Sequence, residues 1–236
     1  MRSNRDYYDE FAGWYERERG HGYHDFLDEV ESTIVGRYAR GGRILEAGCG
    51  TGLILKQVAP LARRAVGLDL STGMLQKARA RGLDVVHGSV TDLPFGDGEF
   101  DLAYSFKVLA HVERIERAMA ELARVVRPGG HVIAEFYNPW SLRGLIKRLK
   151  PPTRISTATT DEAVYTRYDS LPAVRRLLPP SLHIIDVRGV RVFTPFSAVH
   201  DVPLVGHAFA AAETRAASAP LLRHLGGFMV VTAARR

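Results

Sequence analysis

Short apolar runs alternate along the chain with segments of helical period, from about residue 43 onward. Residues 43–47 and 100–105 have the apolar character of buried strands, and longer segments with apolar residues at three- and four-residue spacing separate such runs. The clearest helical face consists of Ile115, Met119, Leu122 and Val126. Alternation of this kind is typical of βαβ units, so we expect an α/β fold with a Rossmann-like, doubly wound sheet.

The same pattern places the remaining elements. We expect strands at 65–70, 84–87 and 131–137, a helix at 51–59, and a helix capped by Ser71. "RPGG" (127–130) ends the long helix before the fifth strand. The C-terminal part adds helices near 171–178 and 203–217 and strands at 182–193 and 226–234. These last strands lack the earlier βαβ rhythm, so we expect a mostly parallel sheet with one antiparallel strand near the C-terminus.

Length and composition favour a single domain. The chain has 236 residues, of which 46% are hydrophobic, enough for one sizeable α/β core and too few for two independent ones. We therefore divide one domain into an N-terminal helical cap (1–40), a core (43–137), and two segments, 139–170 and 195–225, that would cap a substrate site.

Charge and cysteine content restrict the setting. The formal net charge of +6 favours an anionic partner, but an arginine-rich background explains it as well. A single cysteine, Cys49, excludes an internal disulfide and fits a reducing cytosol. The polar start of the chain and the absence of a long apolar run indicate neither a secretory signal nor a spanning helix. We expect a cytoplasmic protein without a metal site, since the histidines show no metal-ligand spacing.

The stretch "ILEAGCGTG" (44–52) carries the first chemical signal. A P-loop would need a Lys-Ser/Thr pair after its glycines, and a dinucleotide fold would need its third glycine at position 53, where this chain has leucine. Glu46 would repel a pyrophosphate but could hold loop N–H groups or face a cation. Asp69 ends the second strand 17 residues after Gly52, where a carboxylate can accept both ribose hydroxyls. A positively charged adenosine without phosphates, S-adenosylmethionine, satisfies these conditions.

Four ordered motifs make a family resemblance specific. "ILEAGCGTG", "AVGLDLSTGMLQKAR", "LPFGDGEFDLAYS" and "ELARVVRPGGHVI" resemble the class I S-adenosylmethionine-dependent methyltransferases. Within them the chain is most similar to the small-molecule branch typified by the ubiquinone and menaquinone biosynthesis enzymes (methyltransferase type 11). The match is dense over about residues 43–137 and loose elsewhere.

The resemblance implies cofactor contacts residue by residue. The methionine part would pass over the glycine loop, and the ribose would bind Asp69. Ser105 and Phe106 belong to the stretch from 104 to 107 expected at the methionine end and the mouth of the substrate cleft. Tyr15, in an N-terminal aromatic segment, would touch the methionine end or simply dock its helix on the core. The loop contacts are Glu46, Gly48, Cys49 and Gly50, and the adenine would pack against Leu70 and Met74.

The adenine contact departs from the family pattern. Ser89 and Val90 stand where relatives usually have Asp-Ala, so a serine hydroxyl replaces the carboxylate that accepts the adenine amino group. Asp92 could substitute only if the loop turned. The uncharged contact is the reason to keep a non-catalytic, cofactor-binding scaffold as an alternative function.

Two further features bear on the acceptor. His111, in "KVLAHV", matches a histidine common in this branch; it would act as a base, orient the substrate, or be structural. Residues 139–154 form a basic amphipathic stretch, which suits either a cap helix or peripheral contact with a membrane or lipid-like substrate.

The sequence thus predicts a methyltransferase acting on an O, N or C atom of a small or lipid-like metabolite. The second hypothesis is a nucleic-acid methyltransferase. It is less favoured, because the basic residues are not interleaved with aromatic residues that could stack on bases. Neither the acceptor nor the oligomeric state follows from the sequence.

Overall fold

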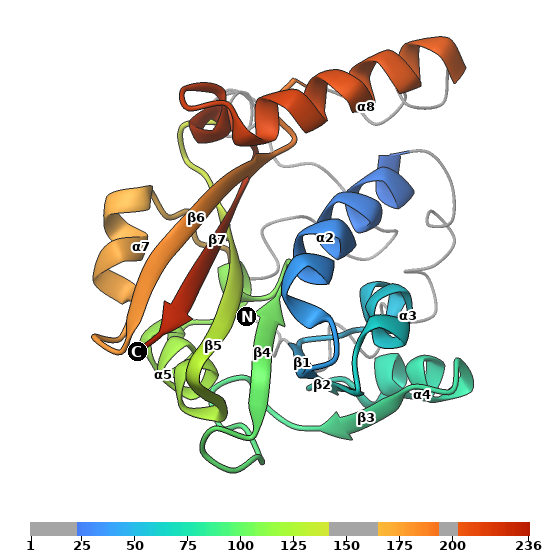
Figure 1. Ribbon diagram of the computed structural model, residues 1–236, viewed down its shortest axis with the longest axis vertical. Helices are drawn as coiled ribbons and strands as arrows, with labels where there is room; N and C mark the ends of the chain where they lie inside the picture. Colours follow the sequence, from blue (N-terminus) through green and yellow to red (C-terminus); the bar gives the residue numbers. More distant parts are fainter. Residues whose placement is uncertain (1–22, 142–164, 194–202) are drawn as a thin grey trace.

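The computed structural model describes residues 23–141, 165–193 and 203–236, and within these ranges seven strands form one sheet (Figure 1). The strands are β1 Arg43–Ala47, β2 Arg64–Asp69, β3 Asp84–His87, β4 Phe100–Ser105, β5 Val126–Tyr137, β6 Leu182–Val190 and β7 Phe228–Arg235. The α-helices are α2 Tyr23–Ala39, α3 Leu53–Val58, α4 Thr72–Ala80, α5 Ile115–Val125, α7 Leu171–Leu177 and α8 Pro203–Ser218. Short 3₁₀ turns are η1 Ala59–Leu61, η2 Leu109–His111 and η4 Leu222–Leu225.

The strand order is β3-β2-β1-β4-β5-β7-β6. Strands β1 to β5 pair in parallel, whereas β7 lies antiparallel between β5 and β6. The doubly wound α/β fold and its antiparallel strand near the C-terminus are therefore confirmed. The chain first winds outward from β1 to β3 and then returns to β4, so the topological switch point lies between β1 and β4.

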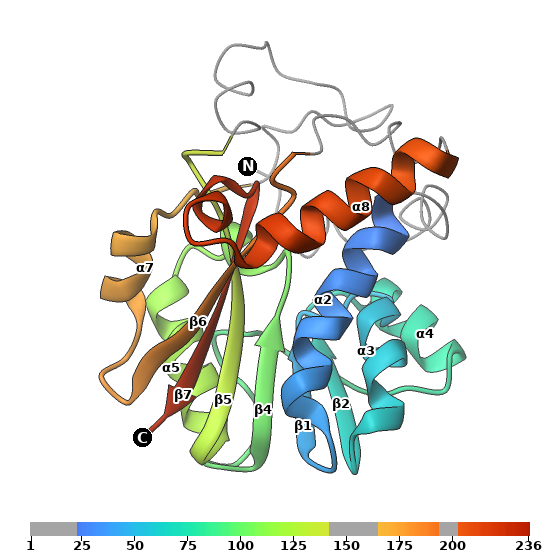
Figure 2. The same ribbon diagram turned by 45° about the horizontal axis from the view of Figure 1, so that its top comes forward.

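Helices cover both faces of the sheet (Figure 2). Because successive side chains of a strand point to opposite faces, Ile44 packs with α2 and α3 while Leu45 packs with the layer of α5 and α7. Both side chains are fully buried, and each contributes about 1.5–3 kcal/mol to the hydrophobic stabilisation. The two layers leave the carboxyl ends of the parallel strands at one edge of the sheet, where loops form the site.

Local boundaries differ from the sequence prediction for identifiable reasons. Helix α3 begins at Leu53 and not at the predicted residue 51, because Gly52, at φ 79°, has a left-handed conformation, and it gives way to η1 near Pro60. The "RPGG" stretch does not precede the fifth strand but belongs to β5 as an irregularity, since Val126 already pairs with Phe100. Ser71 caps α4 as predicted, its hydroxyl accepting the Met74 N–H at 3.1 Å.

None of the helices within the described ranges is long and apolar enough to cross a membrane. The basic stretch 139–154 lies mostly outside the described residues, as does the N-terminal aromatic segment containing Tyr15.

Candidate functional site

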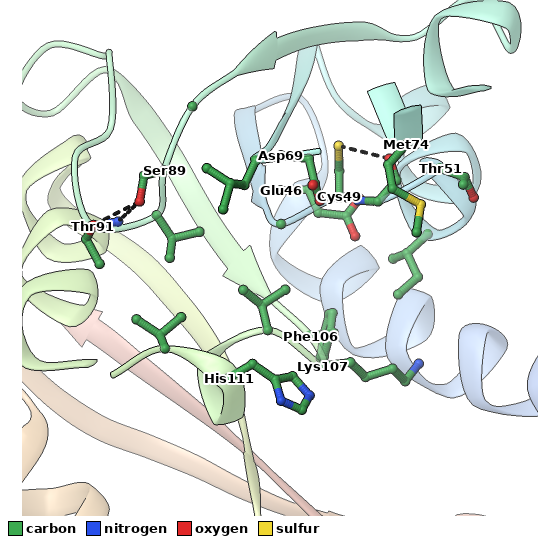
Figure 3. Close-up of a pocket in the computed structure, with 18 of the residues that line it drawn as sticks. Glu46, Cys49, Thr51, Asp69, Met74, Ser89, Thr91, Phe106, Lys107 and His111 are labelled. Atoms are coloured by element: carbon green, nitrogen blue, oxygen red, sulfur yellow. Dashed lines mark hydrogen bonds between the residues drawn. The ribbon is translucent and has the colours of Figure 1, made fainter. Parts of the chain in front are cut away.

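A cavity of about 620 Å³ opens at the carboxyl ends of β1, β2, β3 and β4, on the switch point of the sheet (Figure 3). Its volume falls in the range that binds a cofactor-sized ligand. Ser89 and Thr91 lie in one part of the cavity, whereas Lys107 and His111 lie in another. Loops that follow four different strands therefore meet around one space.

Asp69, at the end of β2, connects two of these loops. Its Oδ2 accepts the Gly50 N–H at 2.8 Å, and its Oδ1 accepts the Ser71 N–H at 2.8 Å. Since each carboxylate oxygen can accept more than one hydrogen bond, both oxygens keep capacity for ligand hydroxyls. The loop N–H that Glu46 could have held is thus held by Asp69.

The glycine turn has two different steric constraints. Gly48 has φ 86°, and a Cβ there would clash with the side chain of Val108, so any larger residue would force Val108 to move. Gly50 has φ 53°, but a Cβ there meets nothing within 4 Å, and this residue lines the cavity. The bare surface at Gly50 is space that a ligand backbone can occupy, which fits an elongated ligand passing over the turn.

Glu46 lines the cavity although it is only 3% exposed. Its Oε2 accepts a hydrogen bond from the buried Tyr104 hydroxyl at 3.3 Å. Burial, with the nearby carboxylates Glu31 and Asp28, raises the pKa of Glu46 well above its usual value despite that hydrogen bond. A cation in the cavity would favour the ionised form, so the environment suits an ammonium or sulfonium ligand.

Lys107, which follows β4 and also lines the cavity, is bound by a buried acidic cluster. Its ammonium donates to Glu31 at 2.8 Å and lies 3.5 Å from Asp28, both on α2. Its backbone N–H donates to Glu135 of β5 at 3.2 Å, and its φ of 59° is uncommon for a side chain with a Cβ. Burial and the neighbouring Glu31 raise the pKa of Glu135. The acids thus fix the turn that follows β4 against α2 and β5.

At the adenine end, Ser89 and Thr91 bond to each other. Their hydroxyl oxygens are 2.8 Å apart, and the Thr91 N–H donates to the Ser89 hydroxyl at 3.2 Å. Both residues line the cavity. Asp92 does not: its side chain is 83% exposed and pairs with Arg117 at 3.4 Å. The structure therefore offers two neutral hydroxyls at this end, and Asp92 does not replace the missing carboxylate.

The opposite part of the cavity is lined by residues that follow β4 and by Tyr165. His111 ends η2, and its Nδ1 lies 2.9 Å from the Tyr165 carbonyl oxygen. Val108 and Val112 add apolar walls, and the exposed Arg114 adds a cation. This mixed lining forms the part of the cavity that could receive a second molecule.

The cavity brings together the predicted cofactor contacts with two exceptions. Tyr15 lies outside the described residues. Ser105, the last residue of β4, does not line the cavity: its buried hydroxyl donates to the Ala47 carbonyl at 2.7 Å. The contacts that do line the cavity are Glu46, Gly48, Cys49, Gly50, Asp69, Leu70, Met74, Ser89, Val90 and Phe106.

Other lining residues carried no recognisable signal in the sequence. Within the described part of the chain, the hydroxyl of Thr51 is buried without a hydrogen-bond partner, although Thr51 lines the cavity. Thr91 lies two residues after Ser89, and no sequence motif marked it as a second polar group of the cavity. Tyr165 comes from a distant segment and could not be placed from local pattern.

Cys49 is buried among carboxylates, which raises the pKa of its thiol far above its usual range. It therefore remains an uncharged thiol and fits a packing role rather than a nucleophilic one. No group of three or more histidine, cysteine or acidic side chains arranged for a metal ion is present in the ranges that the structure describes.

Comparison with known proteins agrees with this geometry. A family model described as "Methyltransferase domain" (Methyltransf_11) matches residues 45–134. The demethylmenaquinone methyltransferase of Renibacterium salmoninarum is 39% identical over 102 residues, covering 42% of this chain and 43% of that protein. The malonyl-[acyl-carrier protein] O-methyltransferase of Serratia marcescens is 35% identical over 109 residues, covering 44% and 42%. The chain thus spans less than half the length of these relatives.

The fold is shared over a longer range. A crystal structure of a SAM-dependent methyltransferase from Thermotoga maritima superposes with a TM-score of 0.69 at 22% identity, covering 98% of this chain and 99% of that one. At this identity the likeness concerns the fold alone. As the sequence motifs predicted, residues 45–134 match a methyltransferase domain, and the chain shares the fold of a SAM-dependent methyltransferase.

Proposed function

We propose that the protein transfers the methyl group of S-adenosylmethionine to an O, N or C nucleophile of a small or lipid-like metabolite. One observation carries the proposal. Asp69 at the end of β2, the buried Glu46 in β1 and the glycine turn that follows β1 all line one cavity at the switch point of the sheet. A ribose acceptor and a cation acceptor in the same cavity suit a charged adenosine and not a nucleotide.

The residues present fit this cofactor. Asp69 would accept the ribose hydroxyls with the oxygens that already tether Gly50 and Ser71. Glu46 would face the ammonium of the methionine part. The half-exposed Leu70 and the buried Met74 offer apolar surface to the adenine. The hydroxyl of Ser89 would accept the adenine amino group, with Thr91 beside it.

When bound, S-adenosylmethionine supplies an electrophilic methyl group on a sulfonium. The chain contributes position and exclusion of water, which are the main requirements of an in-line displacement. Val108, Val112 and Phe106 provide the apolar walls of the part that would receive the acceptor. His111 is the candidate base beside them.

The organisation follows the same division. We infer one methyltransferase domain, with the cofactor half built from the loops after β1, β2 and β3 and the acceptor half built around η2 and Tyr165. The segments 139–170 and 195–225 would complete the acceptor half, and membrane contact through 139–154 concerns residues outside the described ranges.

Titration calorimetry tests the proposal without knowledge of the acceptor. S-adenosylmethionine and S-adenosylhomocysteine should bind, whereas NAD and ATP should not compete. Tight binding of NAD or ATP instead would refute the proposed cofactor. Binding without methyl transfer to any nucleophile in a broad panel of hydroxyl, amine and carbon acceptors would favour the scaffold alternative.

A further inference from the structure

The contacts of His111 define which of its ring nitrogens carries a proton. The Nδ1 atom lies 2.9 Å from the carbonyl oxygen of Tyr165 and 3.3 Å from the hydroxyl oxygen of Thr166. A carbonyl oxygen can only accept a hydrogen bond, so a contact of this length requires hydrogen on Nδ1. A neutral histidine with hydrogen on Nδ1 has its lone pair on Nε2.

The segment that supplies this carbonyl is itself held in place. The Arg167 N–H donates to the Ala110 carbonyl of η2 at 2.8 Å, and the Asp169 N–H donates to the Tyr137 carbonyl of β5 at 2.8 Å. A two-pronged ion pair connects Arg167 with Asp169 at 2.7 and 2.8 Å. The Tyr137 ring meets the imidazole edge to face, with 5.7 Å between the ring centres. The imidazole is therefore fixed between two elements that are far apart in the sequence.

His111 also lines the cavity, in the part bounded by Phe106, Val108, Val112 and Tyr165. Building on the proposed methyl transfer, we propose that His111 is its general base, acting through Nε2, and that Thr166 is a positioning residue that holds the imidazole in this state together with the Tyr165 carbonyl. The acceptor is then a nucleophile that loses a proton during the reaction, a hydroxyl or a primary or secondary amine, and not a thioether or tertiary amine.

The step balances without a further reactant. The acceptor lone pair forms a bond to the methyl carbon, the carbon–sulfur bond breaks, and its electron pair remains on sulfur. The proton of the acceptor passes to the Nε2 lone pair and leaves later to water. The resulting imidazolium keeps its Nδ1–H donor on the carbonyl oxygen, which stabilises the charge.

Thr166 differs from a merely structural neighbour in one measurable respect. The Nδ1–H donates a bifurcated hydrogen bond, to the Tyr165 carbonyl and to the Thr166 hydroxyl oxygen. A hydrogen bond from a charged donor is stronger than one from a neutral donor. Loss of that oxygen therefore destabilises the imidazolium more than the neutral ring and moves the titration of His111 to lower pH.

The first experiment needs no acceptor. Long-range ¹H–¹⁵N spectra of the full-length protein with ¹⁵N-labelled histidine distinguish the two neutral tautomers, and His111→Gln identifies the signal. We expect His111 with hydrogen on Nδ1 at a pH of about 8 to 9, where an ordinary histidine is neutral. The opposite tautomer, with hydrogen on Nε2, would overturn the proposal even if the cofactor binds as expected.

The second experiment uses S-adenosylmethionine with a ¹⁴C methyl group and a panel of phenols, primary amines, tertiary amines and thioethers. His111→Gln should lower kcat for phenols or primary amines by about 10²- to 10⁴-fold, with cofactor affinity unchanged. It should also remove the rise in kcat with pH, between about pH 5 and 8, that deprotonation of a histidine base produces. His183→Gln, an exposed histidine on β6, is the matched control.

The variants at Thr166 test positioning. Thr166→Val should lower kcat by about 2- to 12-fold and shift the rise in kcat to lower pH, and Thr166→Ser should restore both. Ionisable groups on the elements around the imidazole are Lys107, Glu113, Arg114, Glu116, Glu135, Tyr137, Tyr165, Arg167 and Asp169. If kcat of His111→Gln still rises between about pH 5 and 8, or if tertiary amines or thioethers are the preferred acceptors, the assignment of His111 as the base is refuted. If no compound in the panel is methylated, the tautomer of His111 measured in the first experiment decides whether the proposal stands. If S-adenosylmethionine does not bind, the proposed function itself is refuted.

Discussion

Replacement of Asp69 by asparagine separates cofactor recognition from loop stability. In the wild type, each carboxylate oxygen accepts one backbone N–H at 2.8 Å, from Gly50 and from Ser71. Asparagine retains one oxygen, and its amide NH₂ must face the other N–H donor. The variant therefore loses one hydrogen bond to a charged acceptor within the protein and one charged acceptor for the ribose.

Hydrogen bonds to charged groups contribute about 1.5–3 kcal/mol each. Loss of the ribose acceptor alone thus predicts a cofactor affinity roughly 10- to 150-fold lower. Loss of the N–H acceptor predicts a separate decrease, of similar size, in the free energy of unfolding of the cofactor-free protein. Calorimetric titration with S-adenosylhomocysteine measures the first quantity, and urea unfolding measures the second.

Asp101→Asn is a matched control at the other end of the sheet. The Asp101 carboxylate also accepts a backbone N–H, from Arg43 at 2.7 Å, but it does not line the cavity. We expect this variant to lose stability while its cofactor affinity stays within about twofold. If Asp69→Asn behaves in the same way, with nearly unchanged affinity, Asp69 is only a loop tether and the ribose assignment is refuted.

Three further outcomes follow from the geometry. Glu135→Gln should raise the melting temperature more at pH 8 than at pH 5, because burial raises the pKa of Glu135 and the fold prefers its protonated, glutamine-like form. The stabilisation from protonated Glu135 is complete below the ordinary carboxyl pKa of about 4.3 and is lost as pH rises through the folded pKa. An equal gain in melting temperature at both pH values would contradict the raised pKa. Gly50→Ala should fold, at a cost of about 1–2 kcal/mol for its left-handed backbone, but should bind the cofactor poorly, whereas Gly48→Ala should be markedly less stable because its Cβ clashes with Val108. Thermal melts and binding titrations compare the two variants. Normal cofactor binding by a folded Gly50→Ala would show that no ligand passes over Gly50. Ser89→Asp should bind cofactor at least as well as the wild type in titration, since a carboxylate can keep the Thr91 N–H and accept the adenine amino group; a large loss would show that the adenine lies elsewhere.

The cofactor half of the cavity could be predicted from the sequence because its signals are local. The glycine turn follows β1, Asp69 ends β2 and Ser89 lies just after β3, and parallel strands bring their carboxyl ends to one edge of the sheet. Short-range pattern therefore determines which residues lie together there. Ser105 stays a prediction: position along the chain placed it with Phe106, but its hydroxyl is occupied by the Ala47 carbonyl.

The acceptor half could not be predicted in this way. Tyr165 is 54 residues from His111 and reaches it only because the segment after β5 returns across η2. Nothing in the local sequence at Tyr165 or Thr166 specifies that return. The acids that bind Lys107 were easier to find in the sequence, because Glu135 interrupts an otherwise apolar strand and Asp28 and Glu31 are three residues apart on one helix. Their common partner, Lys107, follows only from the three-dimensional structure.

The contrast between the two halves has a physical basis in what each must recognise. The cofactor presents a fixed set of groups, so fixed loops at strand ends suffice, and they are read from short motifs. Lys107 links the two halves: its backbone N–H is bound by Glu135, its ammonium by α2, and its neighbour Val108 packs on Gly48. A shift of this turn would move the glycine loop and the walls beside His111 together. Cofactor affinity and acceptor positioning are therefore coupled through one strained residue, and variants of its acidic partners should alter both, whereas variants at Ser89 should alter cofactor binding alone.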